Sequence, residues 1–363
     1  MVVLMNQELL NRIILMVFVA FISTVVSMPF IKKVALQIGA IDKARPKTRH
    51  IHKKDTPKLG GIAIFIGFLM GYMIYGTHSS TMNAILIGSF IIIITGLIDD
   101  ITELKAYQKL IGQLAAALVI TFYGNILLRD ISAFGLYINF SIFSYPLTIF
   151  FILGCINCIN LIDGLDGLSG GISSIYFLTI GIIATMQGKI GLDFVLTFVM
   201  LGATIGFLVY NFYPASVFAG DSGSMFMGFM IAVIALLGFK NVTMTSLIIP
   251  LLILAIPILD TIFAILRRTL KGENPTQGDR FHIHHQLLNR NFSQRTTVLL
   301  IYAIDLLFAA TSIIYVLKDQ LLGYIMYGIL LFIVLTFVLK TNVVFDSEEI
   351  KRKIKNKIEH KPK

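Results

Sequence analysis

Residues 145–168 read YPLTIFFILGCINCINLIDGLDGL, an apolar run that ends in a polar cluster. The run is long enough for a membrane-spanning helix, which needs about 20 mostly apolar residues. Four polar side chains follow at steps of three, a spacing that places helical residues on roughly one face. They are Asn157, Asn160, Asp163 and Asp166. Carboxylates beside apolar residues need a cation, water or donors, so the stretch predicts a site for a cation and a phosphorylated ligand. A plain polar helix end at the membrane surface is the alternative.

The composition predicts an integral membrane protein. Of the 363 residues, 56% are hydrophobic and 14% are charged, whereas a soluble domain averages roughly 45–50% apolar and 25% charged residues. Long apolar runs recur, so we expect an all-α polytopic membrane protein with about eleven transmembrane helices, ten or twelve being alternatives. The predicted spans are 10–31, 60–76, 83–98, 108–123, 145–162, 168–187, 192–210, 225–239, 244–266, 297–317 and 320–339.

The basic residues predict the orientation of the chain in the membrane. If the N-terminus lies outside, all but five of the 30 Lys and Arg fall in cytoplasmic segments. Positive charge collects on the cytoplasmic side, so the chain is predicted to be N-out and C-in. We expect a transmembrane domain at 1–340 and a basic cytoplasmic tail at 341–363 that lies on anionic lipid. A short outer hairpin is expected within 124–144.

Two more polar clusters fall on the predicted cytoplasmic side in the first third of the chain. Lys54 and Lys58 lie in a basic loop beside a Pro and Gly turn, and we expect them to reach an anionic ligand. Asp99 and Asp100 close an apolar run, where adjacent carboxylates need a nearby cation. Their oxygens are the ligands that Mg2+ prefers; capping of the next helix is the alternative for one of them.

A third cluster runs from Asn211 to Asp221. Gly220 and Gly223 bracket Asp221, so we expect a tight loop whose backbone approaches phosphate oxygens, with Asp221 as a further carboxylate for the cation. Phe218 is expected to stack on a flat ring, and ordinary packing is the alternative for it.

A fourth cluster contains Arg280, His282, His284 and His285. Three histidines in four residues suggest zinc, but adjacent histidines point to different faces of a helix and no cysteine accompanies them. Donors to a pyrophosphate fit better. Taken together, the clusters predict one cytoplasmic site for a Mg2+-assisted reaction of a phosphate substrate. A carrier for a phosphorylated solute is the alternative, although transporters more often place such groups near mid-membrane.

Four of these motifs, in this order, resemble the polyprenyl-phosphate N-acetylhexosamine-1-phosphate transferase family over essentially the whole chain. They are Asp99-Asp100, the stretch from Asn157 to Leu168, Phe218-Ala-Gly-Asp221-Ser-Gly-Ser and His282-Ile-His284-His285. The resemblance implies transfer of GlcNAc-1-phosphate from UDP-GlcNAc to undecaprenyl phosphate, giving undecaprenyl-diphospho-GlcNAc and UMP. The expected partners are these two substrates and membrane lipid, with no nucleic acid. The expected location is the bacterial plasma membrane; a homodimer is left open.

Within the family, the segment around Arg280 and His282 resembles the WecA and TagO (also TarO) branch, which uses UDP-GlcNAc. The MraY branch carries three consecutive histidines there, and Ile283 departs from that pattern. An Ile- and Lys-rich chain that lacks Trp suits a low-GC Gram-positive source and therefore the TagO side of this branch. The resemblance implies that the chain acts at the first membrane step of wall teichoic acid or related cell-envelope glycopolymer synthesis. An MraY-type transfer of phospho-MurNAc-pentapeptide is the alternative within the family.

The resemblance also implies residue roles. Asp221, with help from Asp100, would bind Mg2+ (Mn2+ being an alternative), and the metal would neutralise the pyrophosphate. Asp99 and Asp100 would be the catalytic residues, with Asp99 as the candidate base. Since a phosphate monoester with a second pKa of about 6 is already mostly dianionic at pH 7, positioning of the acceptor is the alternative. The residues expected to bind substrate are Lys54, Lys58, Asn157, Asn160, Asp163, Asp166, Asn211, Phe218, Arg280, His282, His284 and His285.

Overall fold

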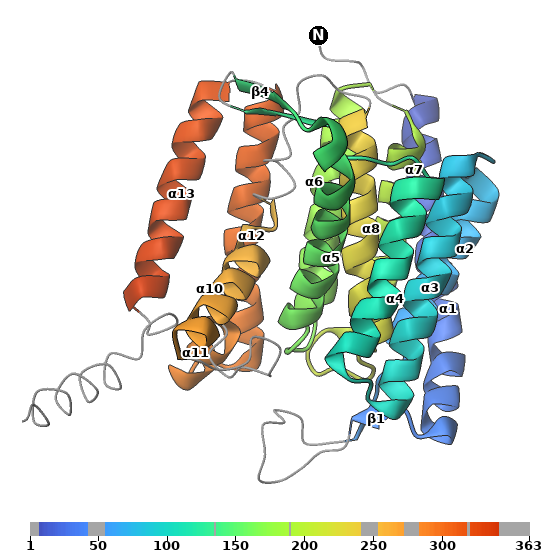
Figure 1. Ribbon diagram of the computed structural model, residues 1–363. Helices are drawn as coiled ribbons and strands as arrows, with labels where there is room; N and C mark the ends of the chain where they lie inside the picture. Colours follow the sequence, from blue (N-terminus) through green and yellow to red (C-terminus); the bar gives the residue numbers. More distant parts are fainter. Residues whose placement is uncertain are drawn as a thin grey trace, which may run out of the picture.

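The computed structural model describes residues 7–42, 55–133, 136–188, 190–240, 253–271, 283–317 and 320–340. These residues form a bundle of long helices that run between two ends of the molecule (Figure 1). The first half contains α1 (Gln7–Ile38), α2 (Gly60–Tyr75), α3 (Ser80–Thr102), α4 (Ala106–Leu118), η1 (Val119–Tyr123), η2 (Ser141–Phe143) and α5 (Ser144–Ile162). The second contains α6 (Leu168–Met186), α7 (Leu192–Asn211), α8 (Gly220–Lys240), α10 (Ala255–Lys271), α11 (Ile283–Asn289), α12 (Gln294–Leu317) and α13 (Gln320–Lys340).

Two short antiparallel ribbons accompany the helices. Strands β1 (Ile41–Asp42) and β2 (Thr56–Pro57) pair next to the start of α2. Strands β3 (Asp130–Ala133) and β4 (Leu136–Asn139) pair at the opposite end of the bundle, with Asp130 opposite Asn139. The second pair confirms the hairpin expected within 124–144; its position outside the membrane stays a prediction.

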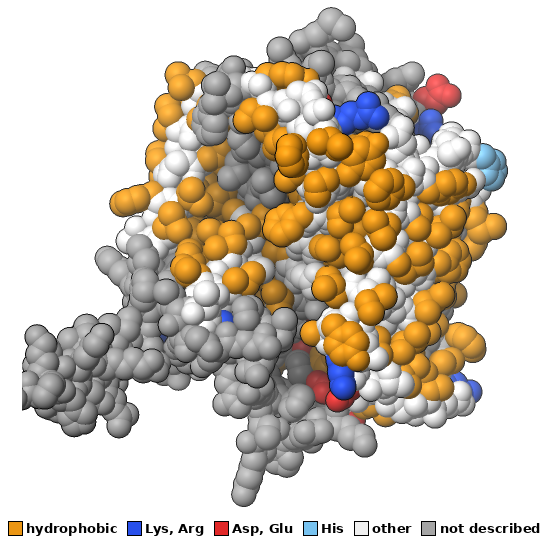
Figure 2. Space-filling view, viewed as in Figure 1, with side chains coloured by type: hydrophobic (Ala, Val, Ile, Leu, Met, Phe, Trp, Pro, Cys, Tyr) orange, Lys and Arg blue, Asp and Glu red, His pale blue; other side chains and the backbone are white. Residues whose placement is uncertain are grey.

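Length and surface chemistry suit the helices to a bilayer. Within the described ranges, α1, α3, α5, α6, α7, α8 and α12 are long and apolar enough to cross a membrane, and α2, α10 and α13 contain shorter apolar segments. Phe18, Phe150 and Phe332 are 56%, 76% and 71% exposed, and hydrophobic side chains are spread over the coloured part of the face in Figure 2. Lipid tails match such a surface. The chain is an all-α polytopic membrane protein, as predicted; the number of spans and their orientation stay predictions.

Helix α8 lies at the centre of the helices that carry the polar clusters. It contacts α2, α3, α5, α6 and α7. A Cβ on Gly61 of α2 would overlap the backbone of Gly223, and a Cβ on Gly96 of α3 would overlap the Cα of Ser222. Because no side chain separates these backbones, the first turn of α8 lies directly against α2 and α3.

The first turn of α8 corrects one expectation. The sequence predicted a span from 225 and a loop around Asp221, but α8 begins at Gly220 and Asp221 lies in its first turn. Gly220 has φ +69°, so the sharp change of direction comes just before the helix. The helix begins early because a side chain of α3 accepts its first backbone N–H groups. The basic tail 341–363 and the start of the predicted span 244–266 lie outside the described residues.

Candidate active site

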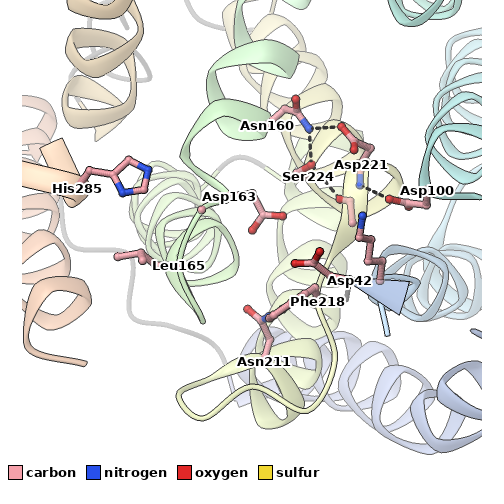
Figure 3. Close-up of a pocket in the computed structure, with 13 residues that line it drawn as sticks. Asp42, Asp100, Asn160, Asp163, Leu165, Asn211, Phe218, Asp221, Ser224 and His285 are labelled. Atoms are coloured by element: carbon pink, nitrogen blue, oxygen red, sulfur yellow. Dashed lines mark hydrogen bonds between the residues drawn. The ribbon is translucent and has the colours of Figure 1, made fainter. Parts of the chain in front are cut away.

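A cavity of about 370 Å3 opens where α2, α6 and α8 begin and α3, α5 and α7 end. It is lined by Asp42, Lys58, Asp100, Asn160, Asp163, Gly164, Leu165, Asn211, Phe218, Gly220, Asp221, Ser224 and His285. Figure 3 shows His285 and Leu165 on one side, across from Asp100 and Asp221. Elements from far-apart parts of the chain therefore build one polar cavity at one end of an apolar bundle.

Asp100 holds the start of α8. Its Oδ1 accepts a hydrogen bond from the backbone N–H of Asp221 at 2.8 Å. Its Oδ2 accepts from the backbone N–H and the hydroxyl of Ser222, at 3.1 and 2.8 Å. The first N–H groups of a helix lack partners within the helix and carry partial positive charge, so a carboxylate is favourable there. Asp100 thus lines the cavity and also caps α8 from α3.

Asp221 faces the cavity from the first turn of α8. Its Oδ1 accepts hydrogen bonds from Asn160 Nδ2 at 2.7 Å and from Lys109 Nζ at 3.1 Å. Asn160 Nδ2 also donates to Ser224 Oγ at 2.8 Å. The Asp221 side chain is 29% exposed, so a ligand in the cavity can reach it. Side chains from α4 and α5 therefore fix this carboxylate without covering it.

Lys109 links Asp221 to Asp99. Its ammonium forms ion pairs with Asp99 Oδ2 and with Asp221 Oδ1. Asp99 Oδ1 accepts a hydrogen bond from the backbone N–H of Leu104 at 2.6 Å, so both oxygens of Asp99 are engaged. Asp99 does not line the cavity. The ammonium of Lys109 therefore supplies part of the positive charge that Asp99 and Asp221 need.

Asp163 follows α5 and is half-buried at the cavity wall. Burial raises the pKa of Asp163 to about 7, against the hydrogen bond from Ser169 and with added repulsion from Asp221 and Asp166. The Ser169 hydroxyl donates to Asp163 Oδ1 at 2.5 Å. A cation in the cavity would favour the charged form of Asp163 and lower its pKa.

Other side chains brace the turn between α5 and α6. Asn211 Oδ1 accepts a hydrogen bond from Gly167 N at 3.0 Å, and Asn211 Nδ2 donates to Val217 O at 2.9 Å. Asp166 Oδ2 accepts from Ala215 N at 2.9 Å. Gly167 has φ +82°, a conformation that glycine adopts without a Cβ penalty. Asn211 lines the cavity, whereas Asp166 does not line it and binds the backbone of Ala215.

The structure brings eight of the predicted site residues together around the cavity. They are Lys58, Asp100, Asn160, Asp163, Asn211, Phe218, Asp221 and His285. Asn157 instead donates to Gln113 Oε1 and to Leu153 O, both at 2.8 Å, and does not line the cavity. Lys54, Arg280, His282 and the side chain of His284 lie outside the described residues. The binding roles of all these residues stay predictions.

Three polar residues at or next to the cavity were not among the expected site residues: Asp42, Lys109 and Ser224. Gln113, which pairs with Asn157, was not expected either. From the sequence, Lys109 is only one of the Lys and Arg on the predicted cytoplasmic side. Lys109 and Gln113 stand four residues apart near the start of the predicted span 108–123, and residues at this spacing share a helix face. That spacing was the available signal. Asp42 lies among basic residues after α1 and offers no comparable pattern.

Known proteins resemble this chain in sequence. A family model described as glycosyl transferase family 4 matches residues 82–239. A probable undecaprenyl-phosphate N-acetylglucosaminyl 1-phosphate transferase of Bacillus subtilis is 39% identical over 314 residues, covering 85% of this chain and 87% of that protein. The chain belongs to the polyprenyl-phosphate N-acetylhexosamine-1-phosphate transferase family. This confirms the resemblance drawn from the four motifs.

Relatives of this transferase extend beyond one group of bacteria. A decaprenyl-phosphate N-acetylglucosaminephosphotransferase of Mycobacterium tuberculosis (strain ATCC 25618 / H37Rv) is 30% identical over 303 residues, 75% of this chain and 74% of that protein. An undecaprenyl-phosphate alpha-N-acetylglucosaminyl 1-phosphate transferase of Escherichia coli (strain K12) is 29% identical over 301 residues, 81% of each chain. The matched segment 82–239 runs from α3 to α8 and contains Asp99, Asp100 and Asp221.

The carboxylates of the transferase suit one mode of metal binding. Within the described ranges, no group of three or more His, Cys, Asp or Glu has the arrangement of a metal site. Mg2+ is commonly held by one or two carboxylates together with water and substrate phosphates. Asp221, fixed but still exposed, fits that mode. Asp100 fits less well because its oxygens already accept three hydrogen bonds.

Proposed function

We propose that this transferase moves N-acetylglucosamine 1-phosphate from UDP-N-acetylglucosamine to undecaprenyl phosphate. The products are undecaprenyl-diphospho-N-acetylglucosamine and UMP. The observation that carries the proposal is the gathering of Asp163, Asp221, Lys58 and His285 around one cavity at the end of a membrane bundle. The names of the relatives from Bacillus subtilis and Escherichia coli, both of which contain undecaprenyl phosphate and N-acetylglucosamine, support the choice of substrates.

Mg2+ is the cofactor of this proposal, with Asp221 as its main protein ligand and Mn2+ as a substitute. Asp221 is favoured for this role because it lies in the first turn of α8 and its side chain is exposed to the cavity. Asp100 would act through α8, by keeping Asp221 in place, rather than as a ligand. When bound, the metal would neutralise charge on the diphosphate and on the departing UMP.

The other charged residues position the two substrates. An oxygen of undecaprenyl phosphate attacks the β-phosphorus of UDP-N-acetylglucosamine, and the bond from that phosphorus to the oxygen of UMP breaks. The attacking phosphate is already mostly dianionic at pH 7, because its second pKa is about 6. Both oxygens of Asp99 are engaged by Leu104 and Lys109, which favours a positioning role for Asp99 over proton transfer. Lys58 and His285 offer N–H donors to phosphate oxygens.

We place the cavity on the cytoplasmic face of a bacterial plasma membrane. The distribution of Lys and Arg along the chain supports this orientation. The product would enter wall teichoic acid or a related cell-envelope glycopolymer, with this transfer as the first membrane step. The resemblance of the segment around Arg280 and His282 to the WecA and TagO branch supports that setting.

Nucleotide release tests the proposal. Purified protein with UDP-N-acetylglucosamine, undecaprenyl phosphate and Mg2+ is expected to release UMP, and omission of the lipid or chelation of the metal is expected to stop the release. UDP-MurNAc-pentapeptide in place of UDP-N-acetylglucosamine is expected to give no turnover. This result would distinguish the proposed reaction from the MraY-type reaction. A carrier would release no UMP at all. Release of UDP, or release without the lipid, would contradict the proposal.

A further inference from the structure

Tyr302 of α12 reaches the turn that carries part of the cavity wall. Its hydroxyl donates a hydrogen bond to Gly167 O. The same oxygen accepts from Gly171 N at 2.8 Å at the start of α6. The Tyr302 ring packs so closely on α6 that a Cβ on Gly171 would overlap the phenol. A side chain of α12 is therefore anchored on the first turn of α6.

Gly167 connects this anchor to the cavity. Its N–H donates to Asn211 Oδ1 at 3.0 Å, so α7 holds one side of Gly167 and α12 holds the other. Asp163 and Leu165, which line the cavity, precede Gly167 in the same turn. Glycine loses more conformational freedom on folding than any other residue. A turn that contains Gly164 and Gly167 therefore depends on outside contacts to keep one conformation.

Helix α12 supports the neighbouring part of the wall as well. It contacts α11, the helix that carries His285. Figure 3 shows His285 and Leu165 on the same side of the cavity, across from Asp221. One helix thus supports both elements of this side, through Tyr302 at the turn and through packing at α11.

We infer that Tyr302 is a positioning residue for the transfer reaction, whose hydroxyl holds the turn between α5 and α6 so that Asp163 keeps its place in the cavity wall. Tyr302 does not line the cavity, so it acts through the turn. The kinetic part of this inference rests on the proposed function. From the usual net contribution of one hydrogen bond, loss of the hydroxyl is expected to lower kcat/KM for the donor about three- to tenfold.

The test compares two tyrosines of the same helix. Tyr302→Phe removes the hydroxyl and keeps the ring. Tyr315→Phe is the matched control, because Tyr315 is buried in α12 and its hydroxyl lies 3.0 Å from that of Tyr324, away from the cavity. Backbone hydrogen exchange over residues 160–172, measured without substrate, is expected to quicken in Tyr302→Phe alone. The fall in kcat/KM is also expected in Tyr302→Phe alone, with similar thermal midpoints for the two variants.

Each outcome has a separate meaning. Unchanged exchange over 160–172 in Tyr302→Phe would overturn the anchor, and faster exchange with native kinetics would overturn the positioning role. Absence of UMP release by the native protein would refute the proposed function and the kinetic part, while the exchange measurement would still decide on the anchor. Gly171→Ala reaches the same contact from α6 and is expected to quicken exchange there. Gly154→Ala is its control, because a Cβ on Gly154 meets nothing within 4 Å.

Discussion

Asp99 and Asp100 are adjacent in the sequence but hold different parts of the site. Asp99 pairs with Lys109 and accepts from the backbone of Leu104, whereas Asp100 accepts three hydrogen bonds from the start of α8. Asp221 differs from both because it remains exposed to the cavity. Substitutions of these carboxylates are therefore expected to differ in their effects on stability and on activity.

Asp100→Asn is expected to destabilise the protein. An amide has a single acceptor oxygen, and its NH2 group would face the N–H groups of α8. Loss of this charged cap is expected to lower the free energy of unfolding by about 2 kcal/mol, measured as a lower thermal midpoint in detergent. A native midpoint for Asp100→Asn would show that α8 does not depend on this cap.

Asp221→Asn is expected to behave differently. The amide keeps the size of the side chain and can still accept from Asn160. It loses the ion pair with Lys109, but Lys109 keeps its pair with Asp99, so the thermal midpoint should fall less than in Asp100→Asn. UMP release should be lost, because the amide lacks the charge needed for a cation beside a diphosphate. Near-native turnover would remove Asp221 from the metal site.

Asp163 is expected to make the metal-free protein less stable at higher pH. Its pKa is raised from 3.8 to about 7, so between these values the folded protein keeps a proton that the unfolded chain loses. The free energy of unfolding therefore falls as pH rises through this window. Asp163→Asn should flatten this fall when thermal midpoints are measured in a chelator. A slope as steep as that of the native protein would contradict the assignment.

At the scale of the elements, the close contact between α3 and α8 is the feature that places Asp100 beside Asp221. Gly96 allows this close contact, because any Cβ there would overlap Ser222 of α8. Alanine generally favours a helix over glycine by about 1 kcal/mol. Gly96→Ala is nevertheless expected to lower both the thermal midpoint and UMP release, by pushing α8 away from Asp100. Gly154→Ala, in open space on α5, should leave UMP release unchanged and should raise the thermal midpoint slightly, as helix propensity predicts. Equal losses in the two variants would contradict the account.

Hydropathy predicted the helices well because the bilayer sets the length of an apolar run. The predicted spans 145–162 and 168–187 match α5 and α6 to within a residue at each end. The start of α8 was missed because its first turn, from Gly220, is polar and depends on Asp100 of α3. That contact joins residues more than a hundred positions apart, and hydropathy contains no term for it.

At the scale of the whole molecule, the separated polar motifs pointed to one site, and eight of the predicted residues do surround one cavity. The sequence could not assign their separate contacts. Whether Asp99 or Asp100 caps a helix depends on where Lys109 and Ser222 lie in space. Asn157 shares the spacing of Asn160 and Asp163, yet its side chain pairs with another helix. Equal spacing did not imply equal surroundings.

The predicted orientation is testable with introduced cysteines, because both natural cysteines, Cys155 and Cys158, are buried. Tyr137→Cys in the β3–β4 hairpin is expected to react with a membrane-impermeant maleimide in intact cells. Lys105→Cys, between α3 and α4, is expected to react only after permeabilisation. Both positions are exposed in the structure. The reverse pattern would place the cavity on the outer face.

The central claim is that the sugar moves together with its phosphate onto a lipid phosphate at this cavity. The direct measurement uses UDP-N-acetylglucosamine labelled with 32P at the β-phosphorus, undecaprenyl phosphate and Mg2+, followed by extraction of the lipid. The label is expected to move into the lipid fraction with the native protein and to stay in the aqueous nucleotide with Asp221→Asn. Label that stays aqueous with the native protein, or that moves equally with Asp221→Asn, would contradict the account.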